Sequence, residues 1–390
     1  NGNIFDVYSG EFAEGVNLKI SNGLIEQVGG EPSSAEEVID CEGKYLIPGL
    51  MDMHTHMVWD GTSSNPAQTM VNEGSYVAML RALHNSQLSA MKGVTTVRDV
   101  GCPNDVTIYL NQAMRMGLAK GADIIPCGSA IMATFGHVPT IGRIADTEDQ
   151  LITAVREVKT LLTEAGEPCQ WIKVMATGGA AGPEEVGPSM YSLSQLKAIA
   201  EEAHRLHMKV CAHALSKEGI INCIEAGIDS IEHGAEIPTE YLLKMKEKGL
   251  AYVPTLSVYR VLSESEGILP ANTVAKAKKV HENHKTTFKK AYELGVTIAL
   301  GTDAGSMNFG EHPSVAREMS DMYNLGMTSS DIIKSATINC AKVLGIEKTK
   351  GSLEKGKIAD IVMLNNNPLN NIKAFENDIF SVYKDGVKVV

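Results

Sequence analysis

Short apolar runs alternate with amphipathic helical patterns through the middle of the chain, and this alternation restricts the possible folds most strongly. The runs include YLIPGLMDMHTH, TTVRDVG, WIKVMATGG, KVCAHAL, SIEHGAE and TIALGTDAGS, and SLSQLKAIAEEAHRLH (192–207) is one of the helical segments between them. Near-continuous apolar strands that alternate with helices predict a parallel sheet covered by helices. Eight such units over roughly 300 residues match an α/β fold of the (β/α)8 TIM-barrel type. A doubly wound open sheet is the structural alternative.

The two ends of the chain have a different texture from the middle. Residues 1–48 and 346–390 contain short alternating strands separated by Gly- and Asn-containing turns. We therefore predict that both ends build one small β-sandwich domain. The chain then divides into an N-terminal part of that domain (1–48), a barrel (49–345) and a C-terminal part of the domain (346–390).

Polar residues at the ends of the predicted strands indicate a functional site. His54 and His56 are two apart in MDMHTH, and alternate residues of a strand point to the same side. Two imidazoles on one face are typical of a metal site. In a parallel barrel the carboxyl ends of the strands meet at one mouth. Four residues of later strands are expected to join the two histidines there: Lys173, His213, His233 and Asp303.

The residue types in this set favour metal-dependent hydrolysis. Histidine nitrogens and carboxylates are ligands for zinc and related divalent ions, whereas a lysine ammonium has no lone pair to donate. Lys173 is therefore a solvated charge, an ion-pair partner, or a lysine carboxylated by CO2 that bridges two metal ions. Two metal ions polarise a carbonyl and share a hydroxide nucleophile, and an aspartate beside them can serve as general base and then acid.

The segments MDMHTH, WIKVMATGG, VCAHAL, SIEHG and LGTDAG follow in the order seen in the amidohydrolase superfamily, which the sequence resembles over nearly its full length. The resemblance implies a hydrolase with two divalent metal ions, expected to be zinc. His54 and His56 would bind the more buried ion, and His213 and His233 the more exposed one. Carboxylated Lys173 would bridge them. Asp303 would bind the buried ion and activate the bridging hydroxide.

Within the superfamily, SIEHGAEI, TGG after Lys173, and VPTLS are most similar to the imidazolonepropionase-like branch. That branch includes prolidases and carboxypeptidase-like dipeptidases for Xaa-Pro, Xaa-Arg or Xaa-Lys. True imidazolonepropionases use one metal ion and lack the lysine, so Lys173 favours the peptidase-like members. The resemblance thus implies hydrolysis of dipeptides or N-acyl amino acids.

Two alternatives to a dipeptidase stay open. Leu215 stands where many dipeptidases of this branch have a tyrosine that contacts the substrate. A cyclic amide, urea, carbamate or aryl amide is therefore an alternative substrate. A non-catalytic barrel that binds a small molecule is the remote alternative.

Several further polar residues are candidates for substrate contact. His137 lies in the long loop CGSAIMATFGHVPTIGRIAD, and long loops at this end of a barrel often carry function. Arg143, Tyr259 and Arg260 follow strands and could bind a substrate carboxylate or simply be solvated. We interpret His281 and His284, in KKVHENHKTTFKK, as part of a solvated helix face.

Composition excludes some functions and suggests a compartment. The net charge of −12 argues against binding to a nucleic-acid backbone. Seven scattered cysteines without a CxxC pair indicate a reduced, cytoplasmic protein. No apolar run is long enough to predict a spanning helix, and no signal peptide is visible, although a removed leader before residue 1 is left open. A homo-oligomer is implied by the resemblance alone.

Overall fold

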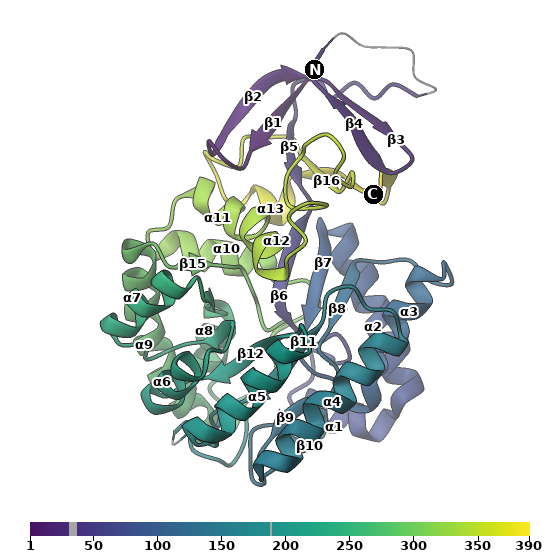
Figure 1. Cartoon of the computed structure of the whole chain (residues 1–390). Coiled ribbons are helices and arrows are strands. Elements are labelled where there is room, and N and C mark those ends of the chain that lie inside the picture. Colours follow the sequence, from purple (N-terminus) through teal and green to yellow (C-terminus); the bar gives the residue numbers. More distant parts are fainter. Residues whose placement is uncertain (31–36, 188) are drawn as a thin grey trace.

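Strands from both ends of the chain share one sheet. The structure, a computed structural model, describes residues 1–30, 37–187 and 189–390, so residues 31–36 of the predicted segment 1–48 lie outside the described residues. Six strands form a mixed sheet in the order β18-β17-β16-β5-β1-β2 (Figure 1). Their bounds are β1 Gly2–Asp6, β2 Glu11–Val16, β5 Tyr45–Pro48, β16 Ile361–Leu364, β17 Ile379–Lys384 and β18 Val387–Lys388. A hairpin of β3 (Leu18–Ser21) and β4 (Leu24–Val28) shares an apolar cluster with this sheet.

Parallel strands build the rest of the sheet structure. Three of them form the sheet β6-β7-β8, and seven form the sheet β10-β9-β11-β12-β13-β14-β15. Their bounds are β6 Leu50–Thr55, β7 Val94–Asp99, β8 Asp123–Pro126, β9 Ala130–Met132, β10 Gly142–Ile144, β11 Trp171–Met175, β12 Lys209–Ala214, β13 Ser230–His233, β14 Ala251–Val253 and β15 Thr297–Ile298. Every residue of β6, β7 and β11 is buried, as expected for parallel strands that are covered on both faces.

The two parallel sheets meet along one edge. The backbone N–H of Met53 donates to the carbonyl of Leu300 at 2.9 Å, and the N–H of Asp303 donates to the carbonyl of His54 at 2.8 Å. These bonds join β6 to the segment after β15. The strand ladders among the described residues do not join β8 to β9. A closed eight-stranded barrel therefore stays a prediction.

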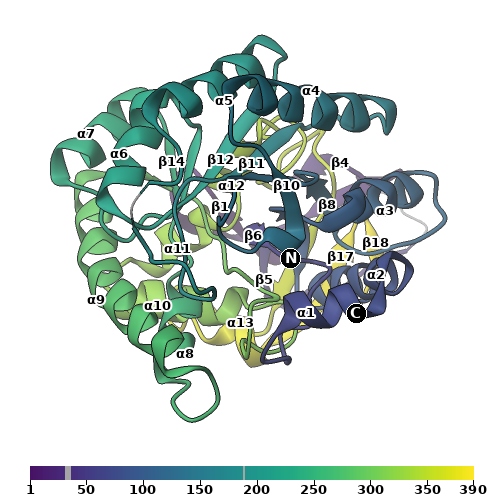
Figure 2. The ribbon, with the colours of Figure 1, turned by 90° about the horizontal axis from the view of Figure 1, so that it is seen from below.

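Helices surround the parallel strands as an outer layer (Figure 2). Two of them begin where sequence signals indicate: α4 follows Thr147 and α5 follows Ser192, each with a capping box to a glutamine three residues later. None of the described helices is both long and apolar enough to span a membrane. The helices are α1 Pro66–Glu73, α2 Ser75–Met91, α3 Val106–Arg115, α4 Glu148–Glu164, α5 Leu193–Arg205, α6 Lys217–Ala226, α7 Thr239–Lys248, α8 Leu256–Glu264, α9 Ala271–Leu294, α10 Val315–Asn324, α11 Ser329–Ser335, α12 Ile338–Leu344 and α13 Ala374–Asn377, with short 3-10 turns at Pro103–Asp105 and Pro139–Ile141.

The order of β5 and β6 decides which end of the strands carries the site. β5 belongs to the terminal sheet and β6 follows it after a single residue, so β6 starts beside that sheet and runs away from it (Figure 1). The other parallel strands run in the same direction. Their carboxyl ends therefore lie at the end of the molecule opposite the terminal sheet.

A buried ion network connects the terminal sheet to the parallel strands. Lys350 lies 2.6 Å from a carboxylate oxygen of Asp123 and 2.6 Å from one of Asp360, and Lys384 lies 2.9 Å from Asp123. Burial lowers the pKa of Lys350, but the charges of Asp123 and Asp360 outweigh it and raise that pKa above its usual value.

Replacing Lys350 by methionine is expected to lower the free energy of unfolding by about 3–5 kcal/mol, because Asp360 would be left as a buried charge without its partner. Denaturant unfolding followed by circular dichroism measures the change. The exposed Lys348 gives the control variant Lys348→Met, which should change stability by no more than about 0.5 kcal/mol. Equal effects of the two substitutions would show that the network does not stabilise the fold.

Candidate metal centre

Three buried side chains form a metal site of the His-His-Asp type. His54 and His56 stand at the end of β6, and Asp303 follows β15. One ligand atom of each lies within 4.8 Å of the other two. Oδ1 of Asp303 is 3.2 Å from Nε2 of His56 and 3.6 Å from Nε2 of His54. This oxygen is buried and has no hydrogen-bond partner among the described residues. Such an atom is costly unless it binds a ligand, so the three residues fit a divalent ion.

The other predicted ligand residues line the same cavity, whose volume is about 280 Å³. The ring of His233 at the end of β13 lies 4.7 Å from that of His54 and 4.6 Å from that of His213 in β12, measured between centroids. Lys173 in β11 is only 1% exposed, and its Nζ makes no hydrogen bond to the part of the chain that the structure describes. The structure thus brings all six residues to one cavity, although only His54, His56 and Asp303 reach mutual ligand distance.

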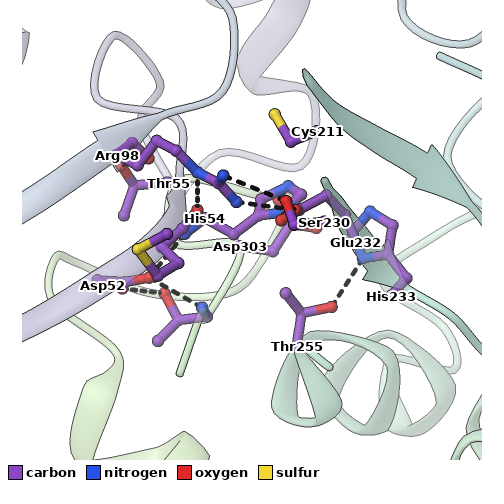
Figure 3. Close-up of polar contacts among 12 residues, drawn as sticks. Asp52, His54, Thr55, Arg98, Cys211, Ser230, Glu232, His233, Thr255 and Asp303 are labelled. Carbon is purple, nitrogen blue, oxygen red and sulfur yellow. Dashed lines mark hydrogen bonds and ion pairs between the residues drawn. The ribbon is translucent and has the colours of Figure 1, made fainter. Parts of the chain in front are cut away.

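A buried carboxylate fixes the ring of His54 (Figure 3). Nδ1 of His54 donates to Oε2 of Glu232 at 2.7 Å, while Oε1 of Glu232 accepts from Nη2 of Arg98 at 2.7 Å and from Oγ of Ser230 at 2.6 Å. With Nδ1 protonated, the lone pair of His54 is on Nε2, which faces Asp303. Neither Glu232 nor Arg98 was predicted from the sequence. The available signal was a charged residue inside each of two apolar strands.

Neighbouring groups also set the tautomers of the other two histidines. Nδ1 of His233 lies 2.7 Å from Oγ1 of Thr255, which leaves Nε2 for a metal ion. Nε2 of His213 donates to the carbonyl of Gly178 at 3.1 Å, which leaves Nδ1. His284 in α9 is buried and donates through Nε2 to the carbonyl of His233. The interpretation of His284 as part of a solvated helix face is therefore wrong.

Three residues at this site have strained backbone conformations. His233, Thr255 and Asp303 have φ values of +68°, +50° and +64°. This left-handed region is unfavourable for residues with a Cβ atom and persists where surrounding contacts enforce it, often at functional sites.

The electrostatics of the site favour neutral histidines and ionised carboxylates. Burial, followed by the nearby Lys173, lowers the pKa of His54 to about 4. Burial also holds the pKa values of His213 and His233 well below the usual range. Burial alone would raise the pKa of Asp303, but the adjacent His56, followed by His54 and Lys173, lowers it. These are the protonation states in which both residue types bind metal ions.

His137 also lines the cavity, on the loop after β9. Its Nδ1 donates to Oε1 of Glu184, and its ring centroid lies 4.6 Å from that of His213. The ring packs against Gly179, where a Cβ atom would lie 2.3 Å from the imidazole. Lys276 in α9 donates to the carbonyls of Gly179 and Glu184 at 3.1 and 2.8 Å. The loop that positions His137 is thus tied to α9, a long-range link that no sequence pattern indicated.

The two candidate arginines lie elsewhere. Arg143 pairs with Glu157, and Arg260 pairs with Asp321 at 3.0 Å. Neither is among the described residues that line the cavity, whereas Tyr259 does line it. Leu215 is buried in an apolar cluster that also contains Tyr259. Much of the remaining cavity wall is apolar, including Trp59, Phe135, Val138, Ile141, Met175, Leu262 and Met307.

Comparisons with known proteins agree with this site. Residues 45–389 match the amidohydrolase family. The chain is 30% identical over 411 residues to ochratoxinase of Aspergillus niger, covering 97% of this chain and 83% of that one. It is 26% identical over 353 residues to imidazolonepropionase of Symbiobacterium thermophilum, covering 84% and 76%. The crystal structure of a Xaa-Pro dipeptidase with bound methionine in the active site superimposes with a TM-score of 0.88 at 30% identity, covering 99% and 98%.

The predicted superfamily and its imidazolonepropionase-like and dipeptidase-like relatives are thereby confirmed, and a non-catalytic barrel is set aside. The chain has the α/β fold of this family, with a sheet shared by both termini. It belongs to the amidohydrolase family and is a metal-dependent hydrolase of carbon–nitrogen bonds.

Proposed function

We propose that this amidohydrolase cleaves the amide bond of N-acyl amino acids or dipeptides and releases the C-terminal amino acid. The observation that carries the proposal is the single cavity lined by His54, His56, Asp303 and the other predicted ligand residues. The similar Xaa-Pro dipeptidase, which holds methionine in its active site, supports an amino acid as one product. The apolar wall favours an apolar or aromatic group on the acyl side.

We propose that the site holds two divalent metal ions, expected to be zinc. His54, His56 and Asp303 would hold one of them, and His213 and His233, whose free nitrogens are Nδ1 and Nε2 respectively, would hold the other. Lys173, once its ammonium has lost a proton, would react as the amine with CO2 to give a carbamate and a second proton, and the carbamate would be a ligand to both ions. Lys173 is buried, and its ammonium makes no ion pair with the residues that the structure describes. This supports the step, because carboxylation replaces a buried cation by a ligand.

Each of several cavity residues then has its own role in the hydrolysis. Bound divalent ions polarise a carbonyl and lower the pKa of water. The carboxylate of Asp303 accepts the proton of the attacking water and returns it to the leaving nitrogen. Glu232 keeps His54 in the tautomer that binds metal. His137, whose Nδ1 donates to Glu184, presents the lone pair of Nε2 to an N–H or O–H group of the substrate.

A non-peptide amide is the second candidate substrate, because one observation favours it. Arg143 and Arg260 are both paired with carboxylates away from the cavity, so neither supplies the bidentate contact that a substrate carboxylate prefers. Leu215, buried in the apolar cluster that also contains Tyr259, adds to the apolar surroundings of the site.

The two candidates are separated by a matched substrate screen. Zinc-loaded protein is incubated with N-acetyl and N-benzoyl amino acids, dipeptides, the C-terminal amides of the same compounds, anilides and phenylureas. Mass spectrometry scores each released amine. We expect release of free amino acids, faster from N-benzoyl than from N-acetyl compounds and at least about tenfold faster than from the C-terminal amides, which lack the carboxylate.

A His54→Ala protein purified in the same way controls for contaminating peptidases. Turnover of anilides or ureas alone, by protein whose metal content is confirmed by mass spectrometry, would contradict the amino-acid product and establish the second candidate.

We also propose that the parallel strands form a (β/α)8 barrel over 49–345 and that 1–48 and 346–390 form a β-sandwich domain. The hydrogen bonds from β6 to the segment after β15 and the apolar cluster between the terminal sheets support this proposal. The homo-oligomer stays a prediction.

A further inference from the structure

Tyr259 lies in the first turns of α8 with its ring beside the candidate metal centre. The ring is edge-on to that of His233, with centroids 5.4 Å apart and an interplanar angle of 84°. It also packs against the ring of His284 at 5.5 Å. The residue is 4% exposed and lines the cavity. From the sequence, Tyr259 was one of three candidates for binding a substrate carboxylate.

Tyr259 lines the cavity, and its hydroxyl makes no hydrogen bond to the residues that the structure describes. The oxygen is not fully enclosed by protein atoms, so a small molecule can reach it. The nearby Tyr252 in β14 differs, because its hydroxyl donates to the carbonyl of Gly234 at 3.4 Å. Since polar groups of largely buried side chains are normally hydrogen-bonded, the partner of the Tyr259 hydroxyl is expected to be a molecule in the cavity.

The start of α8 is fixed in place, so this hydroxyl is pre-positioned. The buried carboxylate of Glu318 accepts from the backbone N–H groups of Leu256 and Ser257 at 2.7 and 2.8 Å. Thr255, the residue before α8, contacts Nδ1 of His233. The segment that carries Tyr259 is therefore anchored both to the protein interior and to a predicted metal ligand.

A phenol in this environment acts as a hydrogen-bond donor. The ordinary pKa of a tyrosine, about 10, keeps the proton on the oxygen at neutral pH, so Tyr259 can donate it to an acceptor. An amide substrate offers two kinds of acceptor near such a donor: the oxygen of the scissile carbonyl and a terminal carboxylate. Tyr259 lies beside His233, whose ring is 4.7 Å from that of His54, and this position favours the carbonyl.

We propose that the hydroxyl of Tyr259 donates a hydrogen bond to the oxygen of the scissile carbonyl and stabilises the negative charge that develops there during attack. The proposal rests on the proposed function, since it needs an amide carbonyl at this site. A fixed donor aimed at a developing oxyanion lowers the barrier because its contact strengthens in the transition state. The phenol keeps its proton throughout.

Replacing Tyr259 by phenylalanine is expected to lower kcat by about 10²–10³-fold with little change in KM, as for loss of one oxyanion donor. Tyr252→Phe is the matched control, because it removes a buried hydroxyl that faces the backbone of Gly234, and it should leave kcat unchanged. Unchanged kcat in Tyr259→Phe, or a raised KM alone, would overturn the proposal, since a raised KM indicates contact with a group that binds equally before and during reaction.

A binding measurement tests the proposed role of the Tyr259 hydroxyl without any substrate. Methylphosphonate imitates a tetrahedral oxyanion, whereas acetate is planar. Calorimetry on zinc-loaded protein is expected to show methylphosphonate bound at least about tenfold more weakly by Tyr259→Phe than by the parent, with acetate affinity unchanged. Equal methylphosphonate affinities, or a loss of zinc from the variant, would overturn the role. If the parent released no amino acid in the substrate screen, the proposed function would fail, and this measurement would still decide the role of the hydroxyl.

Discussion

Replacing Asp303 by asparagine is expected to lower turnover by at least about 10³-fold, within the range for losing a general base. Asparagine preserves the shape of the side chain and one oxygen near His54 and His56, but it cannot accept a proton. The oxygen that faces the two histidines would also lose its charge, so metal content is expected to fall. Steady-state kinetics and metal analysis of the same preparation measure both effects.

Asp321 supplies the matched control for this substitution. Its carboxylate is half-buried and pairs with Arg260 away from the cavity. Asp321→Asn therefore removes a comparable charge and should leave turnover and metal content unchanged. An Asp303→Asn protein that retained a tenth or more of the parent turnover would show that another group carries the proton.

The candidate site was predictable because its residues obey one rule of the fold. Each of the six candidate ligands stands in or just after an apolar run, and the carboxyl ends of parallel strands lie at the same end of a sheet. The histidine and aspartate types then indicated metal binding. Their neighbours in space did not follow from the same rule. Glu232 pairs with His54 from 178 positions away, and Glu184 with His137 from 47. Such pairs depend on tertiary packing, which local patterns do not encode.

His284 shows why one interpretation of the sequence was wrong. It lies in α9, where lysines and glutamates surround it in the sequence and suggest a solvated face. A helix nevertheless has two faces, and the buried one here includes Ala277, Val280, His284 and Phe288, at spacings of three and four residues. The charged residues occupy the other face. Counting charges over the whole segment therefore concealed a buried histidine that supports His233.

β15 is shorter than the sequence predicted, and the structure gives a physical reason. The sequence favoured a strand over TIALGTDAGS, but the ladder with β14 ends at Ile298. Further on, the carbonyl of Leu300 accepts from Met53 in β6, the N–H of Asp303 donates to the carbonyl of His54 in β6, and Asp303 adopts a positive φ. The regular strand therefore ends shortly before Asp303, a predicted metal ligand.

Replacing Lys173 by alanine is expected to remove at least part of the bound metal and to lower kcat/KM by at least about 10³-fold, because a bridging ligand and the metal chemistry depend on it. Two further measurements bear on carboxylation itself. Metal-free parent protein that is reconstituted without bicarbonate should take up less metal than protein given bicarbonate. Added acetate or propionate should partly restore activity to Lys173→Ala, since a small carboxylate can occupy the place of the carbamate.

Lys209, at the start of the next strand, is the matched control. Its ammonium donates to the carbonyl of Val343 away from the cavity, so Lys209→Ala should leave metal content and turnover unchanged. The alternative, in which Lys173 is not carboxylated, predicts different results. If Lys173 is only a buried ammonium, its removal relieves an unpaired charge. The Lys173→Met protein would then bind metal as the parent does and unfold at a higher temperature, with no response to bicarbonate. If Lys173→Ala binds less metal, and the parent reconstituted without bicarbonate also binds less metal, then Lys173 acts in the site as its carbamate.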